Sequence, residues 1–188
     1  MLRRAGALQW YRHRGRYRLA FDWDGPRQVG TGWGGFQTVF GGGDVIYAIR
    51  SDGALLWYYH DGRNQGTTDW QGPKQVGTGW GGFVHLTAVP SGCIYGMQPD
   101  GTLLWYRHYG FDQGYLIWHG PLKVGTGLAP YDAIWAVGNG FMSARTPANG
   151  GDFYVWRHHG FLTGEATWTQ GVKAGNGWGG EFKAVLTT

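Results

Sequence analysis

The sequence predicts an all-β protein, a small β-propeller of four four-stranded blades, and three observations support this prediction. Glycine occupies 37 of the 188 positions, about a fifth of the chain, where roughly 7% is usual. Aromatic residues are also abundant, with 12 tryptophans and 11 tyrosines. Finally, a unit of about 47 residues recurs four times along the chain. Together these features indicate many short strands joined by tight turns.

The composition argues against two other classes of protein. A glycine in a helix interior costs about 1 kcal/mol relative to alanine, and no stretch of this sequence has the density of helix formers that would offset it. Disorder is excluded because 42% of the residues are hydrophobic and only 15% are charged. At 188 residues, the chain is long enough to bury a sizeable core in a single domain.

The register of the repeat follows from residues that return at nearly constant intervals. Tryptophans recur 47, 48 and 50 residues apart, and a histidine column keeps the same register; the two columns are Trp23, Trp70, Trp118 and Trp168, and His13, His60, His108 and His158. A glycine-rich motif follows each tryptophan: VGTGWGGF at 29–36 and 76–83, VGTGLAPY at 124–131, and AGNGWGGE at 174–181. We therefore predict one domain over 1–188, with repeat units at 1–35, 36–82, 83–130 and 131–181 and a closing strand at 182–188.

Each unit is expected to form four strands, and the second copy shows them most clearly. Three apolar runs, at 36–40, 45–49 and 54–60, are separated by short glycine-containing turns. A longer loop then leads to a fourth strand at 69–76, which we expect to be broken by Gly72-Pro73. Four strands in a unit of 40 to 50 residues are typical of a propeller blade.

The two ends of the chain indicate how such a ring would close. The first copy lacks the beginning of the unit, and the tail at 182–187 repeats a first strand. Pairing the tail with the N-terminal strands would remove two exposed sheet edges. A four-bladed monomer and an assembly in trans that completes a larger ring are both open at this point.

The order of the motifs resembles that of a known family. An apolar first strand follows Gly-Gly-aromatic, an aromatic-rich strand follows a turn, and a long loop ends in Trp before a Gly-x-Gly-Trp turn. In this order, over nearly the whole chain, the sequence resembles the tachylectin family of β-propeller lectins. The resemblance implies several equivalent sites between adjacent blades that bind N-acetylated amino sugars, chiefly N-acetylglucosamine and N-acetylgalactosamine. It implies no catalysis and no cofactor.

Nine residues are candidates for carbohydrate binding. A neutral sugar has an apolar face and an edge of hydroxyls, so a site needs a flat aromatic ring and a planar acceptor. The matching positions are the end of the long loop and the tryptophan of the glycine-rich turn: Asp22, Trp23, Trp33, Asp69, Trp70, Trp80, Trp118, Trp168 and Trp178. Core packing is the alternative role for the tryptophans, and a turn or cap acceptor is the alternative for the two aspartates.

The repeat has decayed unevenly, and this ranks the candidate sites. Copies one and two keep both the Asp-Trp pair and the Gly-Trp-Gly-Gly turn. Copy three has Leu128 at the turn position and has lost the carboxylate, and copy four has lost only the carboxylate. The sites that use Asp22 and Asp69 are therefore expected to dominate.

Several function classes find no support in the sequence. It contains no GxSxG, HExxH or Walker motif, so we predict a protein that is not an enzyme. Histidines at equivalent positions of separate blades do not converge, so we expect structural histidines and no metal site. Cys93, the single cysteine, is expected to be a buried apolar side chain.

The partners follow from charge and hydropathy. The net charge is +4, but lysine and arginine are scattered, so no nucleic-acid partner is expected. The longest apolar runs fall far short of the roughly 18 residues that span a bilayer, and the N-terminal residues lack the apolar stretch of a signal peptide. The expected partners are therefore glycans, and a non-catalytic propeller for protein interaction or assembly is the alternative function.

Overall fold

The computed structural model describes residues 6–179, and these residues form antiparallel β-sheets with four short 3-10 turns. The all-β prediction is confirmed. The expected closing strand at 182–188 and its pairing with the N-terminus lie outside the described residues. The described chain divides into two compact parts, which we call the first unit, made of 6–39 and 44–81, and the second unit, made of 40–43 and 82–179. Each repeat of about 47 residues is called a copy.

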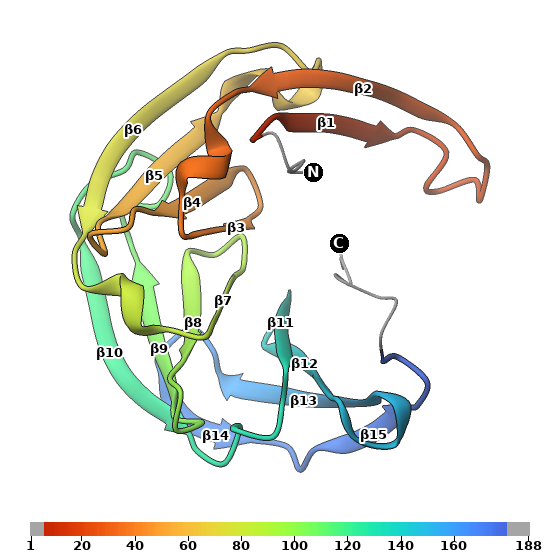
Figure 1. The fold of residues 1–188 in the computed structure, drawn as a ribbon, viewed down its shortest axis with the longest axis vertical. Helices are drawn as coiled ribbons and strands as arrows, with labels where there is room; N and C mark the ends of the chain where they lie inside the picture. Colours follow the sequence, from red (N-terminus) through yellow and green to blue (C-terminus); the bar gives the residue numbers. More distant parts are fainter. Residues whose placement is uncertain (1–5, 180–188) are drawn as a thin grey trace. The chain divides into compact units, whose positions relative to one another are not determined.

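The first two sheets contain the strands of copies one and two (Figure 1). One sheet pairs β1 with β2, and the other has the order β3-β4-β5-β6. The strands are β1 (Leu8–His13), β2 (Trp23–Gly30), β3 (Thr38–Gly42), β4 (Val45–Ile49), β5 (Leu55–His60) and β6 (Trp70–Gly77). The 3-10 turns are η1 (Trp33–Gly35), η2 (Asp61–Asn64) and η3 (Trp80–Gly82).

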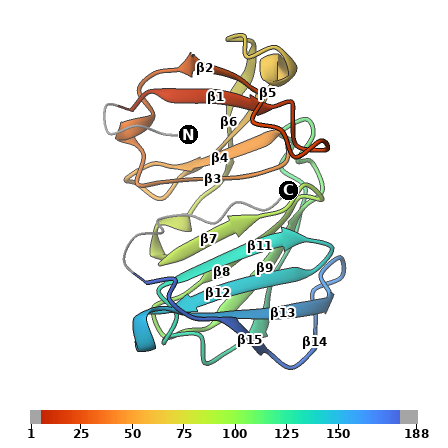
Figure 2. The same cartoon turned by 90° about the vertical axis from the view of Figure 1, so that its right-hand side faces the viewer.

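Two further sheets contain copies three and four. The third sheet has the order β10-β9-β8-β7, and the fourth has the order β11-β12-β13-β14 with β15 also paired to β13. The strands are β7 (His85–Ala88), β8 (Cys93–Met97), β9 (Leu103–His108), β10 (Trp118–Gly125), β11 (Ala133–Gly138), β12 (Phe141–Thr146), β13 (Asp152–Gly160), β14 (Glu165–Trp168) and β15 (Val172–Gly175), and η4 spans Ala148–Gly150. Strands β7 and β11 lie side by side (Figure 2).

The outer strand of the sheets differs from its prediction. In copy two, β6 runs through Gly72-Pro73 without a break, and the ladder with β5 shifts register between Trp57 and Tyr59. A proline has no N–H for the ladder, and a local irregularity on an edge strand accommodates it. In copy four the strand is interrupted instead, because β14 and β15 are separated at 169–171. The break expected at Gly72-Pro73 of copy two is therefore wrong, and the interrupted strand belongs to copy four.

Each unit has a hydrophobic core between its sheets. In the first unit, Leu8 and Val29 pack with Ala48 and Trp33. In the second unit the buried cluster combines side chains of the third and fourth sheets: Val89, Cys93, Tyr95, Met97, Leu103, Trp105, Val124, Ile134, Met142 and Ala144. Side chains on one face of each strand supply these cores, as period-two alternation requires.

In the first unit, β1 of copy one, which corresponds to the third strand of the repeat, clamps the long loop of copy two. The Trp10 indole Nε1–H donates to the carbonyl of Arg63 at 2.6 Å. Two residues further along β1, the Arg12 guanidinium donates to the carbonyl of Asn64 at 2.9 Å. These bonds give two loop carbonyls partners within the protein, where water would otherwise have to supply the hydrogen bonds.

The second unit repeats this clamp between copies three and four. The Trp105 Nε1–H donates to the carbonyl of Phe161 at 2.9 Å, and Arg107 donates to the carbonyl of Leu162 at 2.6 Å. The Cys93 thiol also donates to the backbone carbonyl of Phe161, at 3.1 Å. Cys93 is fully buried as expected, and burial raises the pKa of its thiol.

Candidate functional site

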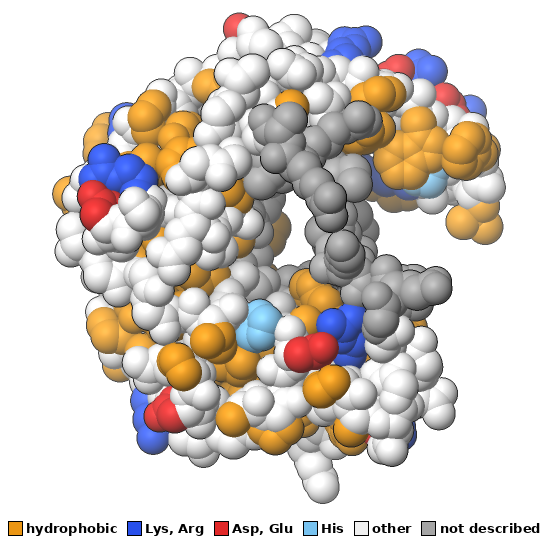
Figure 3. Space-filling model, viewed as in Figure 1, with side chains coloured by type: hydrophobic (Ala, Val, Ile, Leu, Met, Phe, Trp, Pro, Cys, Tyr) orange, Lys and Arg blue, Asp and Glu red, His pale blue; other side chains and the backbone are white. Residues whose placement is uncertain are grey.

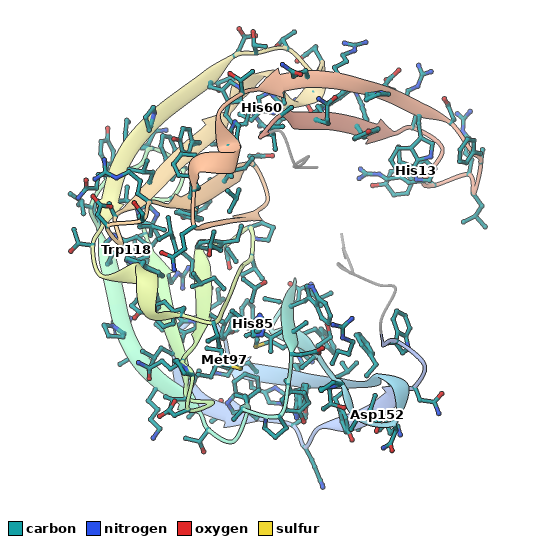
Figure 4. The ribbon with its side chains drawn as sticks, viewed as in Figure 1. His13, His60, His85, Met97, Trp118 and Asp152 are labelled. Carbon is teal, nitrogen blue, oxygen red and sulfur yellow. The ribbon has the colours of Figure 1, made fainter. Side chains whose placement is uncertain are left out.

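In each copy, a histidine at or near the end of the third strand stacks on a tryptophan of the fourth strand. The ring centroids are 4.1 to 4.3 Å apart and the ring planes are nearly parallel in all four pairs, His13 with Trp23, His60 with Trp70, His108 with Trp118 and His158 with Trp168. One member of three of these pairs, His13, His60 and Trp118, is labelled in Figure 4. The two residues are directly opposite each other in the ladder, so the stack follows from the strand register.

Hydrogen bonds hold the same histidines in place. Each Nε2 lies 2.7 to 2.9 Å from a backbone carbonyl seven residues later, at Ala20, Thr67, Tyr115 and Glu165. A carbonyl only accepts, so Nε2 carries the proton. In copy four, Nδ1 of His158 then accepts from the Tyr95 hydroxyl at 2.7 Å. Burial lowers the pKa of His158, which favours this neutral ring.

The first unit contains a cleft of about 230 Å³. Its wall from copy one is the segment 29–33, and its wall from copy two is Phe36, Tyr58, Trp70 and Gly72. The Trp70 Nε1–H donates to the carbonyl of Val29 at 2.7 Å, which ties the two copies together. We call this the first cleft.

The second unit contains an equivalent cleft of about 360 Å³, which we call the second cleft. The segment 124–128 of copy three forms one wall, and copy four supplies the other; the full lining is Leu103, Val124, Gly125, Thr126, Gly127, Leu128, Tyr131, Ile134, Met142, Ser143, Ala144, Trp156, Trp168, Thr169, Gln170 and Gly171. The Trp168 Nε1–H donates to the carbonyl of Val124 at 2.7 Å. This is the counterpart of the bond from Trp70 to Val29.

Both clefts are suited to a neutral ligand with an apolar face. None of the described residues that line them carries a charge. The aromatic walls offer flat apolar surface, and Thr31, Thr126 and Gln170 add hydroxyl and amide groups to the lining. Burial raises the pKa of Tyr58 and of Tyr131, so both hydroxyls remain protonated.

The structure brings three of the nine candidate residues to these clefts. Trp33 and Trp70 line the first cleft, and Trp168 lines the second. The other four tryptophans line neither: Trp80 is buried, Trp23 and Trp118 stack on histidines, and Trp178 stacks on Phe153 with ring centroids 4.9 Å apart.

The two candidate aspartates lie at the base of the long loops and line neither cleft. Asp22 forms an ion pair with Arg14 at 3.2 Å. Asp69 accepts a hydrogen bond from the Thr67 hydroxyl at 2.6 Å, and its backbone carbonyl accepts from the N–H of Gly62. These are loop contacts of the kind that the turn alternative predicts. Their role in sugar binding stays a prediction.

Sequence reasoning missed two aromatic columns that line the clefts. Phe36 and Tyr131 follow the glycine-rich turn, and Tyr58 and Trp156 lie two residues before the column histidine. Alternation along a strand puts the residue two before the histidine on the same face as that histidine, so the register contained this signal.

Two further expectations concern sites of other kinds. Within residues 6–179, no group of three or more histidine, cysteine or acidic residues is placed to hold a metal ion. In the same part of the chain, no helix is long and apolar enough to cross a membrane.

Comparison with known proteins identifies the family. The model of the tachylectin family matches residues 2–187, nearly the whole chain. The chain belongs to the tachylectin family. This is a lectin family, generally non-enzymatic, so membership indicates carbohydrate binding of the lectin type. Among curated proteins, none matches the chain.

A solved structure with a similar fold matches this tachylectin-family chain. It comes from work on the de novo evolutionary emergence of a symmetrical protein shaped by folding constraints. The TM-score is 0.50 at 19% sequence identity, and the alignment covers 81% of this chain. The chain spans 63% of the length of that protein. At this identity the likeness concerns the fold alone.

Proposed function

We propose that this protein is a multivalent lectin that binds N-acetylated amino sugars of the N-acetylglucosamine and N-acetylgalactosamine type in its clefts. Trp70 and Trp168 stack against the apolar face of the sugar ring. The observation that carries the proposal is the fixed position of the Trp168 indole. One face of the indole rests on His158 and its Nε1–H is bound to the carbonyl of Val124.

A fixed indole is what weak carbohydrate recognition requires. Ordering a free side chain on binding costs roughly 0.5–1.5 kcal/mol, and this cost is avoided when the ring is already held. A monosaccharide in a shallow site gains about −4 to −6 kcal/mol, a dissociation constant of about 10⁻³ to 10⁻⁴ M. An avoided ordering cost is a large fraction of that gain.

The lining also supports the N-acetylated class. An acetamido group has an apolar methyl and an amide with one donor and one acceptor. The second cleft offers apolar walls for the methyl beside the polar groups of Thr126, Thr169 and Gln170. Charged sugars gain no partner, because the described lining is uncharged.

We propose further that the four repeats form one propeller domain with four blades. Within each unit, neighbouring copies share a core, a clamp and a cleft in the same register. Repetition of weak sites on one rigid body raises avidity by roughly 10² to 10⁴ on a dense glycan surface. The remaining candidates stay predictions for sugar contact: Asp22, Trp23, Asp69, Trp80, Trp118 and Trp178.

A specific observation favours the alternative, a module for protein interaction or assembly. Hydrophobic side chains, orange in Figure 3, gather over the loop that joins β1 to β2. In this loop Tyr17, Leu19 and Phe21 are 84%, 97% and 98% exposed. Exposed apolar residues gathered in one place are typical of an interaction surface.

Titration of the tryptophan fluorescence tests the lectin proposal. N-acetylglucosamine and N-acetylgalactosamine should change the emission with dissociation constants of about 10⁻³ to 10⁻⁴ M, and glucose should not. Trp168→Leu should remove the contribution of the second cleft. Trp23→Leu, which changes the equivalent tryptophan outside both clefts, should leave it intact. No response to either amino sugar would contradict the proposal.

Multivalency has its own test, on glycan surfaces of two densities. Surface plasmon resonance should give a much tighter apparent affinity on a chip dense in N-acetylglucosamine than on a sparse one. Equal apparent affinities on both chips would show that the sites act singly.

A further inference from the structure

The two clefts are built from the same positions of the repeat, but the second cleft is much larger than the first. The motif VGTG forms a wall of both, at 29–32 and 124–127. The next residue is Trp33 in the first cleft and Leu128 in the second. The first cleft measures about 230 Å³ and the second about 360 Å³.

The indole of Trp33 fills space that Leu128 leaves open. Trp33 is only 5% exposed, and its ring centroid lies 4.7 Å from Tyr58 and 5.7 Å from Trp70. It also lies 5.7 Å from Phe36, so four aromatic rings pack together. Leu128 has a much smaller side chain at the same position.

The position of each side chain is set by the same backbone contact. The N–H of Trp33 donates to the carbonyl of Gly6 at 3.0 Å, and the N–H of Leu128 donates to the carbonyl of Gly101 at 3.1 Å. The glycine three residues earlier lies beneath the side chain in both cases, Gly30 under Trp33 and Gly125 under Leu128. The backbone hydrogen bond and the glycine beneath the side chain are therefore the same in both clefts, while the side chain above that glycine differs.

Other differences change the chemistry of the second cleft rather than enlarge it. Gln170 stands where the first cleft has Gly72. Next to it, Gly171 has no side chain, and a Cβ there would lie 2.0 Å from Nε1 of Trp156. The Trp156 ring therefore occupies the place of a side chain at 171. Ile134 and Met142 form an apolar part of the wall.

Resting on the proposed function, we propose that Leu128 makes the second cleft the site for neutral amino sugars that carry an apolar substituent larger than acetyl. Trp33 closes the first cleft to the same ligands. The shared chemistry is an apolar group beside a neutral sugar ring, and it has two sources, a longer N-acyl chain or an apolar aglycone. The enlarged cleft belongs to the copy whose turn tryptophan is lost, so the loss changes the ligand size and not only the number of sites.

Site-resolved NMR separates the two clefts. The indole Nε1–H groups of Trp70 and Trp168 each donate to a carbonyl at the cleft wall, so their ¹⁵N–¹H signals report on each site. N-acetylglucosamine should shift both signals. N-pentanoylglucosamine and the p-nitrophenyl glycoside of N-acetylglucosamine probe the acyl and aglycone sources, and at least one should shift Trp168 at a concentration at least tenfold below any effect on Trp70.

Variants at the selecting position provide the control. Leu128→Trp gives the second cleft the residue of the first, so the response of Trp168 to the bulky ligand should fall to the level of the Trp70 response. Leu128→Met keeps a side chain of similar volume and should keep the selectivity. In the reciprocal variant, Trp33→Leu, the Trp70 signal should gain a response to the bulky ligand. If that variant does not fold, Leu128→Trp decides alone.

The outcomes distinguish this inference from the proposed function. If N-acetylglucosamine shifts neither signal, the proposed function fails. If it shifts both but the two bulky ligands act equally on both signals or on neither, the size selection is wrong and the lectin function stands. Unchanged selectivity in Leu128→Trp would also overturn the role of Leu128.

Discussion

The long loops of copies one and two, at 14–22 and 61–69, have the same scaffold and very different surroundings. Each is organised by its own histidine, His13 or His60, whose Nε2 donates to a carbonyl seven residues later. The second loop is also clamped by Trp10 and Arg12 of the preceding copy. Among the described residues, no side chain of another copy bonds to the first loop.

One position explains how closely a neighbour approaches each loop. In the second loop Gly66 has φ of +70°, and a Cβ there would lie 2.5 Å from the ring of Trp10. The residue at the same place in the first loop is Leu19, also left-handed with φ of +52° and 97% exposed. The repeat therefore sets the backbone of the loop, and the neighbouring copy decides whether the loop is buried.

The largest expected effect comes from removing a clamp tryptophan in the second unit. Trp105 is fully buried and donates to the loop carbonyl of Phe161. Trp105→Ala should lower the free energy of unfolding by about 3–5 kcal/mol, because it leaves a cavity and an unpaired carbonyl. Chemical denaturation measures this. Trp23→Ala, at a residue 48% exposed, should cost far less. Equal losses in the free energy of unfolding from the two variants would contradict a larger contribution from the clamp tryptophan.

Exchanging the residues at the left-handed position tests the comparison directly. Gly66→Leu should destabilise by about 2 kcal/mol or more, from the left-handed backbone and from the contact with Trp10. Leu19→Gly should stabilise by up to about 1 kcal/mol, because it relieves the same backbone cost at an exposed site. Melting curves of both variants decide, and a stabilising Gly66→Leu would refute the account.

A smaller effect is expected at the base of the loops. Asp69→Ala should cost about 1 kcal/mol of stability, because the Thr67 hydroxyl loses its acceptor. Asp22→Ala should cost less, because the ion pair with Arg14 is exposed. Calorimetric titration of the double variant with N-acetylglucosamine separates the two roles, because a role in the loop alone keeps the stoichiometry and the predicted sugar contact lowers it. Unchanged stability with a loss of about 1.5–3 kcal/mol in binding would instead establish both residues as sugar acceptors.

The smallest effect is a dependence on pH in the histidine-organised loop of copy four. Burial lowers the pKa of His158 below 6.5. The folded state therefore favours neutral His158, and this contribution is fully present above the unfolded pKa of about 6.5 and is lost as the pH falls below it. We expect the melting temperature to fall between pH 7 and pH 5. In His158→Gln, whose amide donates and accepts as the ring does, this fall should be smaller. An unchanged pH profile would contradict the assignment.

The sequence alone was enough for the parts of this protein that depend on local pattern. Glycine content and the repeat of about 47 residues predicted an all-β chain with strands at nearly the observed places in copy two, because alternation and turns are short-range properties. The histidine column was expected to be structural, and its bonds to Thr67 and Glu165 agree with that.

Only the tertiary structure decided which members of each column face a ligand. Trp33 and Trp80 occupy identical motifs in the sequence, yet only Trp33 lines a described cleft. The clefts depend on side chains that lie about 40 residues apart, such as Val29 and Trp70, and pairings at that separation leave no trace in local periodicity. The size of a cleft likewise depends on the volume of one side chain, Leu128, measured against neighbours that belong to the next copy. A repeat therefore encodes its own strands and turns, while its neighbour determines the site.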